Sequence, residues 1–205
     1  MNLLQAHQKL ATLAPFFFTK DAAITLGITP KYASIILSRL AKQNSIVNLS
    51  RGRWAYTAAI NPLLLPNILA FPMKAYVSLY SALYFRGLIS QMPSTVYAIT
   101  NGKTKLFRTR IETVSLHSIS GKLFTGYELL ENTILMATAE KALFDTLYLF
   151  PAKSHFFRRL TELEIPRNFN IALIYKWIKM IGNVSRRSMM ETQLAALLNS
   201  AKQRK

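Results

Sequence analysis

The chain contains no cysteine, and this absence removes several classes of site. Without a thiol there is no disulfide framework, no cysteine-based zinc finger and no thiol nucleophile. The three histidines, His7, His117 and His155, stand far apart and without helical pair spacing, so we expect no metal site. No glycine-rich phosphate loop is present either. We therefore expect no cofactor and no enzymatic activity.

Long hydrophobic runs are also missing. The longest apolar stretch, residues 60–71, is interrupted by Pro62, Pro66 and Asn67 and is too short to cross a bilayer. The N-terminus lacks the basic segment followed by an apolar run that is typical of a signal peptide. These patterns predict a cytoplasmic protein without a membrane partner.

Acidic residues are scarce, and the net charge is correspondingly large. The 205 residues include 26 Lys and Arg against 9 Asp and Glu, which gives a formal net charge of +17. Basic residues exceed acidic ones by six in residues 1–60, by three in residues 61–150 and by eight in residues 151–205. Such an excess indicates nucleic acid or an anionic membrane surface as a partner. An ordinary soluble protein from a basic proteome has the same charge, so charge alone does not decide.

Residues 19–42 show the pattern of a helix-turn-helix. A short helix over residues 19–26 is followed by Gly27, a residue that commonly ends helices. Thr29 then provides an N-cap and Pro30 the first helical position of a longer helix over residues 30–42. A short helix, a tight turn and a longer helix in this order predict a DNA-reading motif.

The longer helix is amphipathic, and its outward side suits a major groove. Ala33, Ile36, Leu37 and Leu40 share one side of a helical wheel and are expected to face the core. The other side offers cations, hydroxyl groups and one apolar residue, with Ser34 and Tyr32 on its flanks, a mixture that can contact phosphates, guanine and thymine methyl groups. These candidate DNA-binding residues are Lys31, Tyr32, Ser34, Ile35, Ser38, Arg39 and Lys42. A plain amphipathic helix with a solvated basic face fits the same pattern.

The segment LSRGRWAYT, residues 49–57, predicts a β-hairpin with Gly52 at its tip. A hairpin tip needs no arginine for its stability, so we expect Arg51 and Arg53 to contact DNA phosphates or the minor groove. Trp54 and Tyr56 are expected to pack the hairpin back onto the helices. Residues 1–60 are therefore predicted to form a winged-helix DNA-binding domain.

The pattern of the remaining residues predicts a second domain that contains both strands and helices. Residues 61–75, with three prolines, are interpreted as a linker, and residues 76–205 as a small antiparallel sheet with flanking helices. The whole chain is thus of the α+β class. Strands are expected at residues 94–100, 105–119 and 123–128, and helices at 78–88, 138–149, 170–181 and 185–201.

Two further groups of charged residues allow more than one interpretation. Cations along one expected hairpin edge either extend a DNA footprint or keep an edge strand soluble; they are Lys103, Lys105, Arg108 and Arg110. Cations of the C-terminal part either bind nucleic acid or an acidic partner, or lie on solvated helix faces; they are Arg158, Arg159, Arg167, Lys176, Lys179, Arg186 and Arg187.

Glu140, Lys141 and Asp145 suggest a nuclease at first sight, but the spacing argues against one. Glu140 and Asp145 are five positions apart on a helix, which places them about 140° apart around its axis, so they do not share a face. No second acidic cluster precedes them in a strand.

Three stretches in order, YVSLYSALYFRGLISQMPSTVYAIT, FTGYE and ATAEKALFDTLYL, follow the expected winged helix. In this order the chain resembles the AbiEi family, the antitoxin and transcriptional repressor of abortive-infection (type IV) toxin–antitoxin pairs. The resemblance implies binding to double-stranded DNA with inverted repeats at the protein's own operon. It also implies a C-terminal domain that counteracts a nucleotidyltransferase-like toxin, an effect described in the family as occurring without a stable complex.

The helix-turn-helix and hairpin thus predict DNA binding, and the resemblance implies an autoregulating repressor and antitoxin. The alternative from another class is a winged-helix protein-interaction module without sequence-specific DNA binding.

Overall fold

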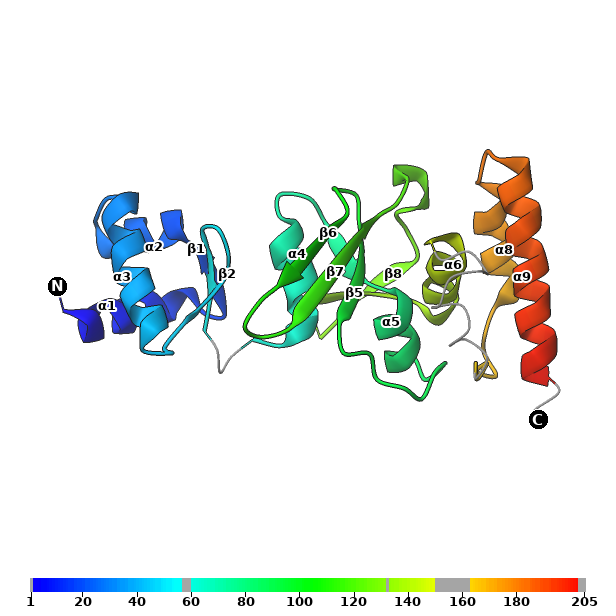
Figure 1. Cartoon of the computed structure of the whole chain (residues 1–205), viewed down its shortest axis with the longest axis horizontal. Helices are drawn as coiled ribbons and strands as arrows, with labels where there is room; N and C mark the ends of the chain where they lie inside the picture. Colours follow the sequence, from blue (N-terminus) through cyan, green and yellow to red (C-terminus); the bar gives the residue numbers. More distant parts are fainter. Residues whose placement is uncertain (1, 57–59, 132, 150–162, 203–205) are drawn as a thin grey trace.

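The structure is a computed structural model that describes residues 2–56, 60–131, 133–149 and 163–202. It is an α+β protein of elongated shape (Figure 1). A helical module with a small sheet lies at one end, a larger sheet lies in the middle, and two helices close the other end. His155, Arg158 and Arg159 lie outside the described residues.

The N-terminal module contains three helices and a three-stranded antiparallel sheet of order β1-β3-β2. The sequence predicted the two helices at residues 19–26 and 30–42 and the hairpin, but not β1. The elements are α1 (Leu3–Leu10), a 3-10 turn (Ala11–Leu13), β1 (Phe16–Phe18), α2 (Thr19–Leu26), α3 (Pro30–Lys42), β2 (Val47–Ser50) and β3 (Arg53–Ala55).

The turn between α2 and α3 forms as its residues predict. Gly27 ends α2 in the left-handed conformation, with φ of 66°. Thr29 caps α3, because its side-chain oxygen accepts a hydrogen bond from the Tyr32 amide at 3.4 Å, and Pro30 takes the first helical position. These two signals fix where each helix ends and begins.

A six-stranded sheet and its helices form the larger part of the chain. The strands are β4 (Ala75–Val77), β5 (Val96–Thr100), β6 (Lys105–Arg108), β7 (Thr113–Ser118), β8 (Tyr127–Leu130) and β9 (Ile134–Ala137). The helices are α4 (Leu65–Ala70), α5 (Leu79–Phe85), α6 (Ala139–Leu149), α8 (Ile171–Lys179) and α9 (Val184–Lys202), with 3-10 turns at Pro62–Leu64 and Gly121–Leu123.

This sheet is larger than the small antiparallel sheet predicted from the sequence, and it is mixed. Its order is β6-β7-β5-β4-β9-β8, and two of its strand pairs, β5 with β7 and β4 with β9, are parallel. The prediction missed β4 and β9, and it took residues 105–119 as continuous strand, whereas residues 109–112 separate β6 from β7 and β7 pairs with β5 in parallel. Every residue of β4 is buried, so this three-residue strand shows no alternation of apolar and polar side chains.

Residues 61–75, interpreted as a linker, carry regular structure. They hold α4 and the first residue of β4, and α4 packs against β4, β5 and β7. Leu65, Ile68 and Leu69 of α4 belong to the core of the sheet. No helix of the described ranges is long and apolar enough to cross a membrane.

Gly126 offers a test of how tightly this part of the chain is packed. Its φ is +75°, and an added Cβ would lie 2.8 Å from the Trp177 ring and 3.0 Å from the Lys141 side chain. Gly87 is a matched control, because its φ is +72° but no atom lies within 4 Å of the same position.

We expect Gly87→Ala to lower the free energy of unfolding by about 1–2 kcal/mol through backbone strain alone. Gly126→Ala should cost about 1–3 kcal/mol more, because overpacking adds to that strain. Chemical denaturation of both variants measures the difference. Equal losses in the two variants would contradict the close packing at Gly126.

Candidate nucleic-acid interface

The outward side of α3 carries the candidate residues predicted from the sequence. Ala33, Ile36, Leu37 and Leu40 are buried, which confirms the predicted amphipathic pattern. The remaining side is exposed, and Ile35 is 43% exposed there. The exposed set is Lys31, Tyr32, Ser34, Ile35, Ser38, Arg39 and Lys42.

The cations of this side are not paired with a carboxylate in the part of the chain that the structure describes. Among the described residues there are two ion pairs, and neither involves a cation of α3. The Ser34 hydroxyl donates to the Pro30 carbonyl at 3.0 Å, and the Ser38 hydroxyl donates to the Ser34 carbonyl at 2.8 Å. Both hydroxyl groups therefore face a ligand as hydrogen-bond acceptors.

A shallow open pocket lies within this surface. It is lined by Ser34, Ile35, Ser38, Arg39 and Lys42. One exposed apolar side chain between hydroxyl groups and two cations can meet both base edges and phosphates.

The two arginines of the hairpin have different surroundings. Arg51 is exposed. The next residue, Gly52, has a φ of +73°, which confirms that the hairpin tip requires a positive φ, a backbone conformation that glycine adopts readily. Arg53 is only partly exposed and is bound within the chain. Its guanidinium donates to the Phe71 carbonyl at 2.6 Å and to the Ser50 hydroxyl at 3.1 Å. Arg51 is therefore the freer of the two cations.

Trp54 and Tyr56 pack the hairpin onto the helices, as predicted. Trp54 is buried in the core of the N-terminal module, and its indole N–H donates to the Thr19 hydroxyl at 2.9 Å. The Tyr56 hydroxyl donates to the His7 carbonyl at 3.2 Å. Partial burial raises the pKa of Tyr56.

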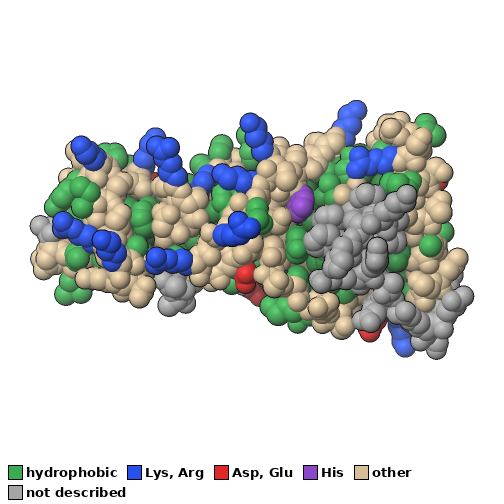
Figure 2. All heavy atoms as spheres, viewed as in Figure 1, with side chains coloured by type: hydrophobic (Ala, Val, Ile, Leu, Met, Phe, Trp, Pro, Cys, Tyr) green, Lys and Arg blue, Asp and Glu red, His purple; other side chains and the backbone are tan. Residues whose placement is uncertain are grey.

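A second group of cations lies on the β6 edge of the larger sheet. Lys105 and Arg108 are exposed on β6, and Lys103 and Arg110 are exposed on either side of it. The prediction that these cations line an edge of the sheet is thus confirmed, because β6 is the first strand in its order. Figure 2 shows Lys and Arg side chains over the N-terminal module and over the middle of the molecule on one face, where acidic side chains are few.

The C-terminal cations are more dispersed. Arg167, Lys176 and Lys179 are exposed, whereas Arg186 is engaged within the chain. The Arg186 guanidinium stacks on the Tyr148 ring at 3.9 Å and donates to the Tyr148 carbonyl at 2.6 Å. Arg187 is only partly exposed. Arg186 therefore joins α9 to α6 rather than offering its charge to a partner.

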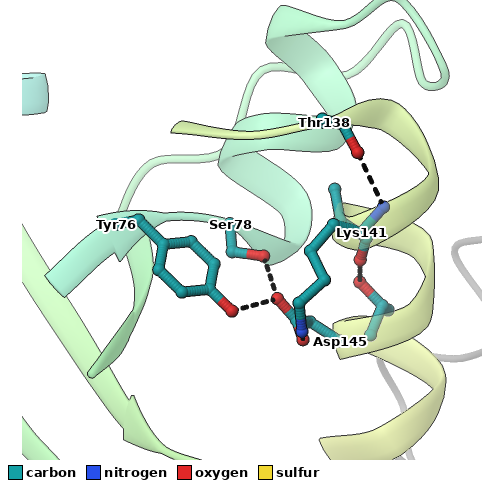
Figure 3. Close-up of polar contacts among 7 residues, drawn as sticks. Tyr76, Ser78, Thr138, Lys141 and Asp145 are labelled. Carbon is teal, nitrogen blue, oxygen red and sulfur yellow. Dashed lines mark hydrogen bonds and ion pairs between the residues drawn. The ribbon is translucent and has the colours of Figure 1, made fainter. Parts of the chain in front are cut away.

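A buried ion pair lies in the core of the larger part (Figure 3). Lys141 and Asp145, one turn apart on α6, form an ion pair with no exposed side-chain surface. Asp145 also accepts hydrogen bonds from the Tyr76 hydroxyl at 3.0 Å and from the Ser78 hydroxyl at 2.7 Å. These hydrogen bonds join β4 and Ser78, the residue after it, to α6.

Burial opposes charge on both members of this pair. Burial lowers the pKa of Lys141 and raises the pKa of Asp145, and the attraction between the two groups partly offsets each effect. The Lys141 ammonium also lies 4.6 Å from the centre of the Phe144 ring and 5.6 Å from the Trp177 ring. The charged form is thus held by a carboxylate and by aromatic faces.

Glu140 and Asp145 do not come together as a pair of carboxylates that could share a metal ion. The Glu140 carboxylate accepts from the Asn170 amide at 2.9 Å, whereas Asp145 points into the core. Within the described part of the chain, no three His, Cys, Asp or Glu side chains come close enough to hold a metal ion.

Sequence reasoning named Lys141 and Asp145 only as nuclease candidates and missed Tyr76 and Ser78 as their partners. The available signal was the i, i+4 spacing of opposite charges in a helix that is otherwise mostly apolar. The long-range partners lie 69 and 67 residues away from Asp145 in the sequence, and nothing local indicates them.

Comparison with known proteins adds no identification. No family model matches the chain, and the search of curated proteins found no match either.

The buried pair predicts a specific pattern of stabilities. Lys141→Met should lower the free energy of unfolding by about 3–5 kcal/mol, because it leaves the Asp145 carboxylate buried without a cation. The double variant Lys141→Met with Asp145→Asn should recover much of this loss, since the amide oxygen still accepts from Ser78. Urea unfolding of the three proteins measures the effect. A double variant less stable than Lys141→Met would contradict the explanation that an unpaired buried carboxylate causes the loss.

Proposed function

We propose that residues 1–60 form a winged-helix domain that binds double-stranded DNA. The observation that carries the proposal is the outward side of α3, where three cations that have no carboxylate partner among the described residues surround exposed Ile35 and two hydroxyl groups. The order α2, turn, α3 and hairpin supports the same proposal. In such an arrangement the second helix enters the major groove and the hairpin tip lies beside it.

The proposed roles follow from the chemistry of each side chain. Lys31 and Arg39 contact phosphates or guanine, and Ile35 contacts a thymine methyl group. Ser34 and Ser38 accept hydrogen bonds from base amino groups. Tyr32, 47% exposed, flanks the groove-facing side. Lys42 and Arg51 contact the phosphate backbone and fix the register without reading sequence.

We further propose that the chain is a repressor and antitoxin of the AbiEi kind, which controls its own operon and counteracts a nucleotidyltransferase-like toxin. Besides the order of the motifs, a contact among them supports this proposal. Tyr76 and Ser78 of the first motif bind Asp145 of the third, and Tyr76 stacks on Tyr127 of the second with ring centres 4.6 Å apart. Residues that carry the resemblance thus share one buried cluster.

The first experiment is a mobility-shift titration with DNA from upstream of the protein's own start codon and with scrambled DNA, at two salt concentrations. Tight binding to the upstream fragment alone, retained at the higher salt, supports the repressor. Weak, equal and salt-sensitive binding to both favours a protein-interaction module. Cleavage of either fragment on addition of Mg²⁺ would instead reveal a nuclease.

The antitoxin role is tested in cells. If the neighbouring reading frame encodes a nucleotidyltransferase-like protein, its expression should arrest growth, and expression of this chain should restore growth. The full chain with Lys31→Gln, Arg39→Gln and Lys42→Gln should also restore growth, because the proposed DNA contacts lie outside the larger part of the chain. Rescue that requires the α3 cations would contradict this division of roles.

Phosphate and base contacts predict different effects of substitution. Arg51→Gln should reduce the slope of log K against log salt by about 0.9 and weaken binding to all sequences alike. Ile35→Ala should change the preference among operator variants by about 1–3 kcal/mol per affected base pair. Fluorescence anisotropy measures both, with Lys122→Gln, an exposed cation in the 3-10 turn Gly121–Leu123, as the control. A slope that Arg51→Gln leaves unchanged would remove the hairpin tip from the interface.

The β6 edge has two interpretations that the same assay separates. If Lys105 and Arg108 contact the duplex, Lys105→Gln with Arg108→Gln should reduce the salt slope by about 2. If they only protect the edge strand, the slope should stay the same and the double variant should aggregate more readily, which light scattering detects.

A further inference from the structure

The hairpin β2–β3 takes part in both hydrophobic cores. Successive side chains of a strand point to opposite faces. Trp54 belongs to the core of the N-terminal helices, whereas its neighbour Ala55 belongs to the core of the larger sheet. Val47, which pairs with Ala55, and Leu49 also belong to the larger core. One face of the hairpin therefore packs on each part of the molecule.

Arg53 lies on β3 beside Trp54 and joins the hairpin to the segment that precedes β4. Its guanidinium donates to the Phe71 carbonyl and to the Ser50 hydroxyl. Its Nε is buried and has no partner among the described residues. An arginine held in this way is poorly placed to turn toward a phosphate, because its release would leave the Phe71 carbonyl without this bond.

An aromatic contact accompanies this bond. The Phe18 and Phe71 rings lie 5.1 Å apart between centres, and Phe18 pairs with Arg53 in the small sheet. Phe71 thus makes two contacts: its carbonyl accepts a hydrogen bond from the Arg53 guanidinium, and its ring packs against the Phe18 ring. Both contacts join the N-terminal sheet to the end of α4, 18 residues beyond Arg53.

We propose that Arg53 is a positioning residue that fixes the N-terminal module against the six-stranded sheet, with the hairpin as a rigid joint. This inference goes beyond the proposed function and does not depend on DNA binding. It separates the two arginines of the tip: Arg51 faces the solvent, whereas Arg53 holds the two parts of the chain together. With the joint intact, cations of both parts lie on the face that Figure 2 shows.

The absence of cysteine makes a direct test possible, because two introduced cysteines become the only labelling sites. Gln8→Cys on α1 and Lys122→Cys beyond β7 are both at exposed positions, one in each part. Spin labels at these positions allow the distribution of distances between them to be measured by pulsed electron paramagnetic resonance in the full chain without DNA.

We expect a narrow distribution in the parent protein and in the control Arg51→Ala. Arg53→Ala should broaden the distribution at least twofold, and Arg53→Lys, which keeps the charge but loses the two-nitrogen contact, should broaden it less. Circular dichroism checks that each variant is folded, and Arg53→Lys serves as the test if Arg53→Ala is not. A distribution as narrow in the folded Arg53 variants as in the parent would overturn the proposal, as would equal broadening by Arg51→Ala.

Discussion

The alternation of side chains along one short hairpin is the constraint on which the arrangement of the molecule depends. β3 has only three residues, yet Trp54 packs among the N-terminal helices while Ala55 packs with the larger sheet. A shift of the strand by one residue would exchange these faces and place Trp54 where Ala55 now fits. β3 also pairs with β1 over three residues, along the edge opposite β2, and this second pairing fixes the register of β3. The position of α3 relative to the rest of the chain follows from this register.

The second constraint is the buried polar cluster on α6. Charges removed from water are costly, and they persist where partners satisfy them. Here Asp145 binds Lys141, Tyr76 and Ser78, so a helix late in the chain is tied to the strand that follows α4. The joint at Arg53 and this cluster thus lie at the two ends of one short stretch, residues 71–78. A change in that stretch acts on both parts of the molecule.

Local signals in the sequence predicted local structure well. Gly27, Thr29 and Pro30 set the boundaries of α2 and α3, and the wheel of α3 predicted its buried side. Strands β4 and β9 could not be found in this way, because they are short, buried and without alternation. The partners of Arg53 and Asp145 were also beyond reach, since each contact joins residues 18 to 69 positions apart. For the candidate site, the sequence identified which α3 residues are exposed but did not distinguish Arg51 from Arg53.

If the outward side of α3 meets a DNA duplex, as we propose, photo-cross-linking will detect that contact. A photoreactive amino acid would replace Ile35, and in a second protein it would replace Ile24, an 80% exposed apolar residue of α2. Each protein would be irradiated with radiolabelled upstream DNA. The account predicts a covalent protein–DNA product from position 35 and little from position 24. Equal products from both positions, or none from position 35 under conditions where the DNA is bound, would contradict it.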